Sequence, residues 1–199
     1  MERFQNTVTK KRDSVVIKKD RWLILKRAIV SGTLGGYGAA IAALLAGKYE
    51  NGFFAGPLNA TSHIIWGDEA VRQNRFSLKF TFTGFMLNHG SGIFWALFYE
   101  KLFGKGARKQ KNDSSLHSDL NISFTKPLLG AAVIAASAYV IDYHLIPRRF
   151  TPGFEHRVSV KSLAVILAAL AVGLATRDII SARQNRQKSR SVPLTQKTP

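Results

Sequence analysis

The chain has no cysteine among its 199 residues, and this absence excludes several kinds of chemistry. It leaves no thiolate nucleophile, no disulfide, and no zinc or iron–sulfur site with cysteine ligands. Common catalytic patterns are missing as well, because the sequence has no Walker-type phosphate loop, no GxSxG turn and no HExxH or HxxxH pair. We therefore expect no bound cofactor.

Acidic residues are scarce, with 12 Asp and Glu against 29 Lys and Arg, and the formal net charge is +17. The basic residues stand in short clusters beside apolar runs and are not interleaved with aromatic residues. This pattern argues against nucleic acid as a partner. Attraction to anionic lipid headgroups, on the order of 1 kcal/mol for each Lys or Arg near the surface, explains the excess. The expected partner is a lipid bilayer with anionic headgroups.

Charged residues are absent from two runs of twenty residues, 28–47 and 80–99. A helix of this length crosses a hydrocarbon core of ~30 Å. Two further mostly apolar segments, 127–147 and 160–178, complete a set of four predicted spans. The sequence thus predicts an all-α fold, an integral membrane four-helix bundle over residues 28–176.

Small residues recur at helical spacing within the first two spans. The first span carries two neighbouring stripes, which are Gly32, Gly36 and Ala40 beside Gly35, Ala39 and Ala43. The second span gathers small or polar residues on one face, namely Gly84, Asn88, Ser91, Gly92 and Trp95. In lipid, small residues let two helix backbones approach closely, so these faces are predicted to pack against protein.

The distribution of Lys and Arg predicts the orientation of the spans. Residues 1–27, 101–126 and 177–199 carry 21 of these residues, whereas the intervening loops 48–79 and 147–161 carry 8. The positive-inside rule then places both basic termini and the 101–126 loop in the cytoplasm. The two intervening loops are predicted to lie on the outer side of the membrane.

Two segments outside the spans have a predicted character of their own. Residues 53–66, in the first outer loop, are apolar but too short to cross a membrane, which predicts a short interfacial or re-entrant helix. The basic tail 179–199 is polar and without periodic pattern, which predicts a disordered cytoplasmic segment.

Ionisable residues of the outer loops and the adjoining spans form a candidate ion or proton site: His63, His89, Asp142, His144, Glu155 and His156. Ionisable groups inside a membrane are costly and face the protein interior, and imidazoles and carboxylates are metal ligands. The alternative is structural, with His89 hydrogen-bonded between helices and Asp142 paired with an arginine. Residues 142 and 144 lie ~200° apart around a helix, which opposes joint ligation of one ion.

Two arginines, Arg148 and Arg149, stand at the outer end of the third span, where the positive-inside rule does not favour them. Their planar guanidinium groups suit a phosphate headgroup, which makes them candidate headgroup-binding residues. The alternative is that they pair with Asp142 and Glu155 and extend to the membrane interface.

The features that carry a resemblance are the basic tails, residues 56–70, GPLNATSHIIWGDEA, and residues 142–155, DYHLIPRRFTPGFE. In overall layout, residues 28–176 resemble the small, mostly uncharacterised four-helix inner-membrane proteins of Gram-negative bacteria. The resemblance implies a bacterial inner membrane and transfers no activity. The leading hypothesis is a structural, interaction or stress-related membrane component, with a helix-packing partner or a second copy of the chain. The alternative is a membrane enzyme or transporter that uses the outward His/carboxylate cluster for protons, metals or phospholipid headgroups.

Overall fold

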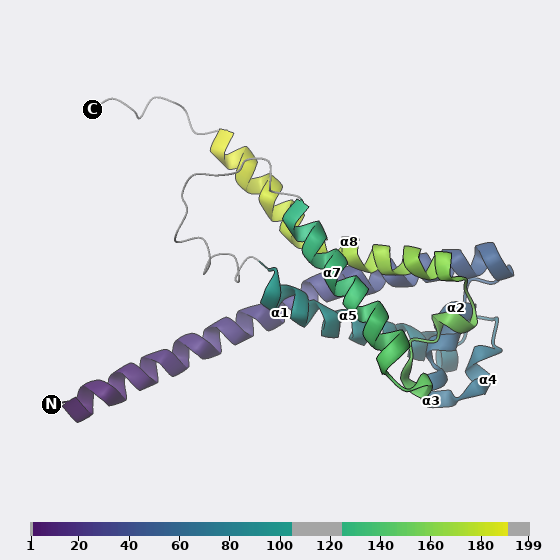
Figure 1. The fold of residues 1–199 in the computed structure, drawn as a ribbon, viewed down its shortest axis with the longest axis horizontal. Helices are drawn as coiled ribbons and strands as arrows, with labels where there is room; N and C mark the ends of the chain where they lie inside the picture. Colours follow the sequence, from purple (N-terminus) through teal and green to yellow (C-terminus); the bar gives the residue numbers. More distant parts are fainter. Residues whose placement is uncertain (1, 105–124, 191–199) are drawn as a thin grey trace.

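The computed structural model describes residues 2–104 and 125–190. Every regular element among these residues is a helix, which confirms the all-helical fold. The long helices are α1 (Glu2–Asn51), α5 (Thr83–Leu102), α7 (Thr125–Val140) and α8 (Val160–Arg190), shown in Figure 1.

Three of the helical segments are long and apolar enough to cross a membrane: Asp20–Asn51, Thr125–Leu145 and Val160–Gln184. They correspond to the first, third and fourth predicted spans. The second predicted span, in α5, does not reach the same hydropathy, because Asn88, His89 and several Gly and Ser residues interrupt its apolar residues. The fourfold crossing therefore remains a prediction.

Short helices fill the two connections at one end of the fold. The first connection holds α2 (Gly56–Thr61), α3 (His63–Trp66), α4 (Asp68–Val71) and the π-helix η1 (Leu78–Phe82). The second holds the π-helix η2 (Ile141–Leu145) and the 3-10 turns η3 (Arg148–Phe150) and η4 (Phe154–His156). We call this end of the fold the loop end.

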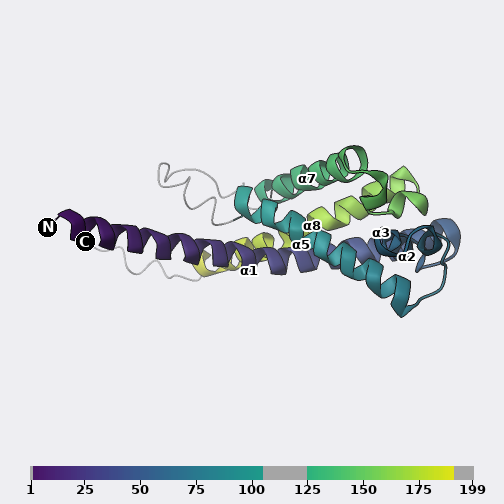
Figure 2. The same cartoon turned by 90° about the horizontal axis from the view of Figure 1, so that it is seen from below.

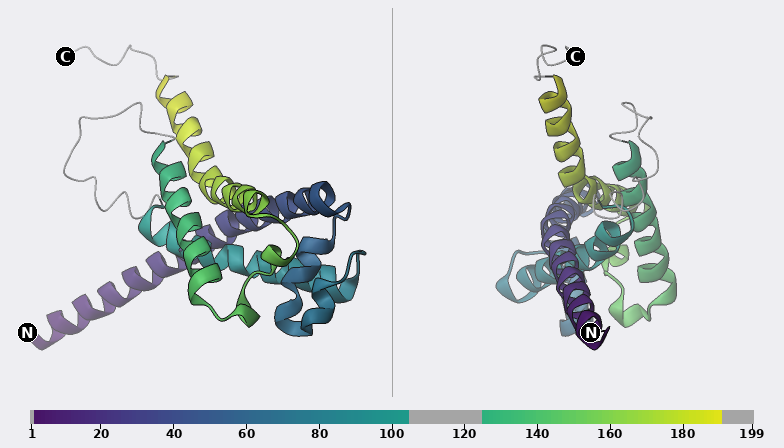
Figure 3. Two further views of the ribbon diagram at one scale, coloured as in Figure 1. Left: turned by 45° about the vertical axis from the view of Figure 1, so that its right-hand side comes forward. Right: turned by 90° about the vertical axis from the view of Figure 1, so that its left-hand side faces the viewer.

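The first residues of α1 and the last residues of α8 lie toward the opposite end, which we call the tail end (Figures 1 and 3). α1 runs from the tail end to the loop end, α5 returns, α7 runs outward again, and α8 returns once more (Figure 2). The four long helices therefore alternate in direction along the same overall axis.

α1 is the central helix, and it packs against α5 on one side and α8 on another. Gly32 lies so close to α5 that a Cβ atom on it would stand 2.4 Å from the Cα of Ile93. Gly173 of α8 has the same relation to α1, since its Cβ would stand 2.5 Å from the Cα of Gly35. The two small stripes of α1 thus face two different helices, which is why both crossings are so close.

α7 occupies a more peripheral place than α1. It packs mainly against α8 and touches α5 more lightly. Its small residues Ala131, Ala135 and Ala138 are buried in this contact side, whereas Leu129 and Val133 are exposed. α5 and α8 thus pack on α1, and α7 packs mainly on α8, so the long helices are not equivalent neighbours and the predicted four-helix bundle remains unconfirmed.

The short helix α2 is buried along its whole length. It rests on α5 at Gly84, where a Cβ atom would stand 1.7 Å from the carbonyl oxygen of Leu58. The side chain of Asn59 holds the following loop, since its Nδ2 donates to the carbonyls of Gln73 and Arg75, each at 3.0 Å. The predicted interfacial or re-entrant segment 53–66 is therefore a folded cover on the loop end, and its place in a membrane remains a prediction.

Both basic tails continue the long helices beside them. α1 begins at Glu2, within the basic N-terminal segment. α8 continues to Arg190, so residues 179–190 are described as helix, and 191–199 lie outside the described residues; the disorder predicted for 179–199 stays a prediction. The apolar helices that precede or follow each tail supply the costly first turns, and helix then propagates into the polar segment.

Candidate functional site

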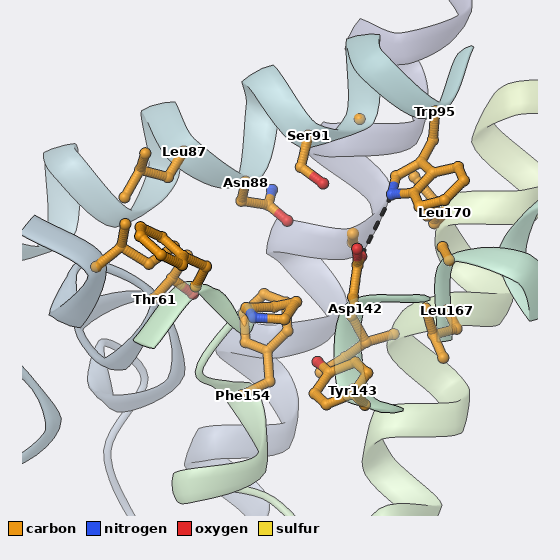
Figure 4. A pocket seen from close by; sticks show the side chains of 17 residues that line it. Thr61, Leu87, Asn88, Ser91, Trp95, Asp142, Tyr143, Phe154, Leu167 and Leu170 are labelled. Carbon is orange, nitrogen blue, oxygen red and sulfur yellow. Dashed lines mark hydrogen bonds between the residues drawn. The ribbon is translucent and has the colours of Figure 1, made fainter. Parts of the chain in front are cut away.

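A cavity of about 140 Å³ lies between the long helices near the loop end. α1, α5, α7 and α8 each contribute to its wall, with Ala39, Ser91, Ala138 and Leu170 as examples. Residues of the η3–η4 segment also line the cavity, so it lies where two distant parts of the chain meet. Figure 4 shows its principal side chains.

Asp142 is the carboxylate in this cavity. Its Oδ2 accepts a hydrogen bond from the indole Nε1 of Trp95 at 3.3 Å (Figure 4). Asp142 lies in η2, where Ile146 N donates to Ile141 O across five residues at 3.0 Å. Pro147 follows and cannot continue the helix, so the chain widens into a π-turn at this point. π-turns of this kind frequently occur at functional sites.

Two further polar side chains of α5 point into the same cavity (Figure 4). Asn88 is buried, and its Nδ2 donates to the carbonyl of Gly36 at 2.9 Å. Its amide oxygen therefore remains available to the cavity. Ser91, which is exposed, stands one turn further along α5 and adds a hydroxyl oxygen to the lining.

Aromatic and apolar side chains form the remaining wall. Trp95 and Phe154 are buried, with exposed fractions of 4% and 5%, and Tyr143 and Phe150 complete the aromatic lining. Phe154 follows Gly153, whose φ of 84° suits a residue without a side chain. A Cβ atom on Gly153 would also stand 2.6 Å from the carbonyl oxygen of Ala60, so this turn packs directly on α2.

Three of the six candidate site residues come together outside this cavity, beside α2. The rings of His63 and His156 meet edge to face, with centroids 5.5 Å apart. His156 Nε2 stands 3.7 Å from Glu155 Oε1, and that oxygen also accepts a hydrogen bond from Thr151 Oγ1. His63 is buried, and its two ring nitrogens face the carbonyl oxygens of Ala60 at 2.8 Å and Arg148 at 3.4 Å.

The other candidate residues stand apart from this group and from one another. His89 contacts the rings of Tyr37 and Phe85, and its buried Nδ1 has no hydrogen-bond partner among the described residues. His144 is exposed and lies against the ring of Tyr139, with centroids 5.2 Å apart. Asp142 instead faces the cavity, as expected for two positions on opposite sides of a helix.

Arg148 and Arg149 are exposed in η3. The ion pairs found among residues 2–104 and 125–190 include no pair between these arginines and Asp142 or Glu155. Their headgroup-binding role therefore remains a prediction, with the guanidinium groups accessible at the loop end. Across the same residues, no three His, Asp or Glu side chains stand close enough to hold a metal ion.

A second polar cluster, at the tail-end side of the core, was not predicted from the sequence. Arg177 Nη2 donates to both carboxylate oxygens of Glu100, at 2.9 and 2.7 Å, and to Oδ1 of Asp178 at 3.0 Å. Ser31 donates to Glu100 Oε1, and Tyr99 donates to Asp178 Oδ2 at 3.3 Å. The side chain of Glu100 is fully buried, and that of Asp178 is 1% exposed.

The sequence contained only a weak signal for this cluster. Glu100, Arg177 and Asp178 stand at the ends of predicted spans, where charged side chains are ordinary and reach the interface. Only the packing of α1, α5 and α8 shows that they turn inward and meet.

Comparison of the chain with known proteins identifies neither a family nor an activity. No protein-family model matches the chain, and neither the curated proteins nor the solved structures include a significant match.

Proposed function

We propose that the chain is a four-span protein of the bacterial inner membrane with both termini in the cytoplasm. Three helices of sufficient length and hydropathy support the proposal, together with α5, which runs between two of them in the opposite direction. The alternating directions agree with the excess of Lys and Arg in the tail-end segments. The loop end then faces the outer side.

The faces of α5 explain how it serves as the second of the four spans despite its polar residues. Asn88 and Gly92 are buried against α1, and Trp95 is buried at the cavity. Phe94 and Phe98 are exposed on the other side, with exposed fractions of 51% and 42%. The amide of Asn88 thus faces protein, whereas the exposed residues of α5 include large apolar groups beside the single hydroxyl of Ser91, an arrangement that suits lipid.

The lipid bilayer is the first proposed partner. Large apolar side chains are exposed at the loop end, including Trp66, Phe76 and Leu78. Lys79 stands 5.2 Å from the ring centroid of Trp66, so a cation and an aromatic ring share this surface. Such pairs are typical of the headgroup region, where aromatic rings and lysines stay at the interface. No role for nucleic acid is proposed.

The proposed activity is the binding of a small solute in the Asp142 cavity, as a transporter or a membrane enzyme requires. One observation carries this proposal: a carboxylate in a helix long and apolar enough to span the membrane faces a cavity, and no basic residue of the described chain pairs with it. A purely structural role favours filled space and paired charges in this position. The hypothesis of a structural membrane component is therefore kept as the alternative to solute binding.

The absence of cysteine allows a direct test. In the Ser91→Cys variant, we expect a membrane-impermeant thiol reagent added to the outer side of intact cells or spheroplasts to label the cavity. Asp68→Cys, at an exposed loop-end position, serves as the labelled control, and Ser137→Cys, beside the exposed Val133 of α7, serves as the lipid-facing control.

Labelling of Asp68→Cys without labelling of Ser91→Cys would contradict a cavity that is open to the outer side. The same result would leave the membrane topology standing, and a structural role would then be favoured. Labelling of Ser137→Cys at the rate of Asp68→Cys would show that this position of α7 faces water and not lipid. That result would contradict the proposed span in α7.

A further inference from the structure

We infer that the Asp142 cavity binds an alkylammonium group, which is the charged head of a small organic cation. This inference rests on the proposed solute-binding function and assigns its chemical class of ligand. The observations that carry it are the acceptor character of the polar lining, the absence of a basic partner, the aromatic wall and the volume of the cavity.

The charged group of the polar lining is an acceptor. The indole N–H of Trp95 already donates to Asp142, and one N–H of the Asn88 amide already donates to Gly36. The carboxylate of Asp142 and the amide oxygen of Asn88 remain as acceptors, beside the hydroxyls of Ser91 and Tyr143, which can donate or accept. The carboxylate therefore favours a ligand that supplies N–H donors or a positive charge.

No charge within the described chain neutralises Asp142. The helix η2 also holds His144 and is followed by Arg148 and Arg149, but His144 lies against Tyr139 and the two arginines are exposed. Tyr143, also of η2, lines the cavity beside Asp142, and the elements packed against η2 contribute no His, Lys, Arg, Asp or Glu to the lining described. A negative charge in this place favours a cationic ligand and repels an anion.

The aromatic wall and the volume define the ligand further. Trp95, Tyr143, Phe150 and Phe154 line the same cavity as the carboxylate, and aromatic rings attract an ammonium group that lies over their faces. A cavity of about 150 Å³ accommodates benzene, so about 140 Å³ accommodates an ammonium group with a few carbon atoms. A metal ion fits less well, because no cluster of three His, Asp or Glu exists in the described part of the chain.

Charge selectivity in labelling tests the inference. With the Ser91→Cys protein in vesicles, we compare the rates of a trimethylammonium-ethyl thiosulfonate and its sulfonate-ethyl counterpart, and we refer their ratio to the ratio at the exposed Asp68→Cys, because any thiolate reacts faster with the cationic reagent. We expect the ratio at Ser91→Cys to be roughly tenfold higher than this reference. Adding Asp142→Asn should bring the ratio down to the reference, because the amide keeps the shape of the carboxylate and loses its charge, and adding Asp68→Asn to Ser91→Cys should leave the ratio unchanged. A ratio equal to the reference in the Ser91→Cys protein would overturn the inference and leave a solute-accessible cavity in place.

Protection by ligands separates the possible sources of the ammonium group. In phosphatidylglycerol vesicles, which carry no ammonium headgroup, we expect propylammonium chloride to slow labelling of Ser91→Cys and propanol to have no effect. If phosphatidylethanolamine in the vesicles slows labelling without added amine, the ammonium group belongs to a lipid headgroup. Protection by propanol equal to that by propylammonium would overturn the inference, because apolar contact alone would explain it.

A second measurement does not depend on access from the outer side. In a protein with Trp22→Phe and Trp66→Phe, Trp95 is the remaining tryptophan. We expect propylammonium to shift its emission in detergent, and we expect Asp142→Asn to remove the shift. The absence of any shift would overturn the inference even if the cavity is closed to thiol reagents. The emission of Trp95 could shift with propylammonium although Ser91→Cys is not labelled from the outer side. That combination would overturn the proposed opening of the cavity to the outer side, and it would support binding of an alkylammonium group.

Discussion

Individual glycines set the distance between the helices of this protein. Gly32 stands against backbone atoms of α5, and backbone cannot move aside as a flexible side chain can. Gly90 lies in α5 on a side that faces away from α1, and no atom stands within 4 Å of a Cβ built on it. Both glycines are in long helices, but only Gly32 is tightly packed.

We predict that Gly32→Ala lowers the thermal unfolding temperature in detergent and that Gly90→Ala leaves it unchanged or raises it. The first substitution forces α1 and α5 apart, whereas the second only improves helix propensity, by about 1 kcal/mol or less. Circular dichroism during heating measures both. Equal stability of the two variants would show that α1 and α5 do not approach closely at Gly32.

His89 shows how a residue-scale hypothesis changes once its neighbours are known. The sequence suggested either a hydrogen bond between helices or a titratable site. In the structure, the ring of His89 contacts Phe85 and Tyr37, and its Nδ1 is buried without a partner among the described residues. Its contacts are therefore those of an aromatic packing residue, and it stands outside the Asp142 cavity.

At the scale of helices, the buried cluster of Glu100, Arg177 and Asp178 connects α5 with α8. Ser31 adds α1 to the same hydrogen-bond network. The arginine is the central member, because it binds two carboxylates that are almost without solvent exposure. Breaking a buried ion pair by removing one partner leaves an uncompensated charge.

We predict that Arg177→Gln destabilises the protein by roughly 3 kcal/mol, the lower end of the range for removing one partner of a buried pair. Lys161→Gln, an exposed position at the other end of α8, should change stability little. Adding Glu100→Gln to Arg177→Gln should restore part of the loss, since a carboxylate left without its arginine is then neutral. Denaturant unfolding in detergent gives these values, and a loss of similar size in Lys161→Gln would exclude a specific role for the cluster.

At the scale of the whole molecule, the alternating long helices separate the chain into two ends of different chemistry. The tail end carries most of the Lys and Arg, and the loop end carries the short helices, the exposed aromatic residues and the nearby cavity. A membrane between these ends gives each surface the environment that its residues favour.

We predict that reporter fusions after residues 10, 110 and 190 give cytoplasmic signals and that a fusion near residue 72 gives an outer-side signal. The physical reason is the excess of Lys and Arg in the segments beside the first three positions. Paired phosphatase and fluorescent-protein fusions measure the location. A cytoplasmic signal at residue 72 would show that α1 does not cross the membrane or that the orientation is reversed.

Local patterns in the sequence were sufficient for part of this structure. Apolar runs predicted the long helices of the first, third and fourth spans, because helix formation and transfer into lipid depend on consecutive residues. The repeated spacing of Gly32, Gly36 and Gly35 placed two small stripes on α1, and each stripe lies against another helix. The single face with Asn88, Ser91 and Trp95 likewise contains residues of the cavity.

The identity of each contact was decided only by the tertiary structure. The sequence grouped Asp142 with histidines of the outer loops, whereas the structure places it beside Trp95, and it leaves His63 with Glu155 and His156. The meeting of Glu100 with Arg177 spans 77 positions and was not foreseen. Helical periodicity states which side a residue occupies on its own helix, but not which distant helix covers that side. The charge-free spans and the basic tails were thus determined by the sequence itself, while the cavity and the buried ion cluster arose from packing between distant segments.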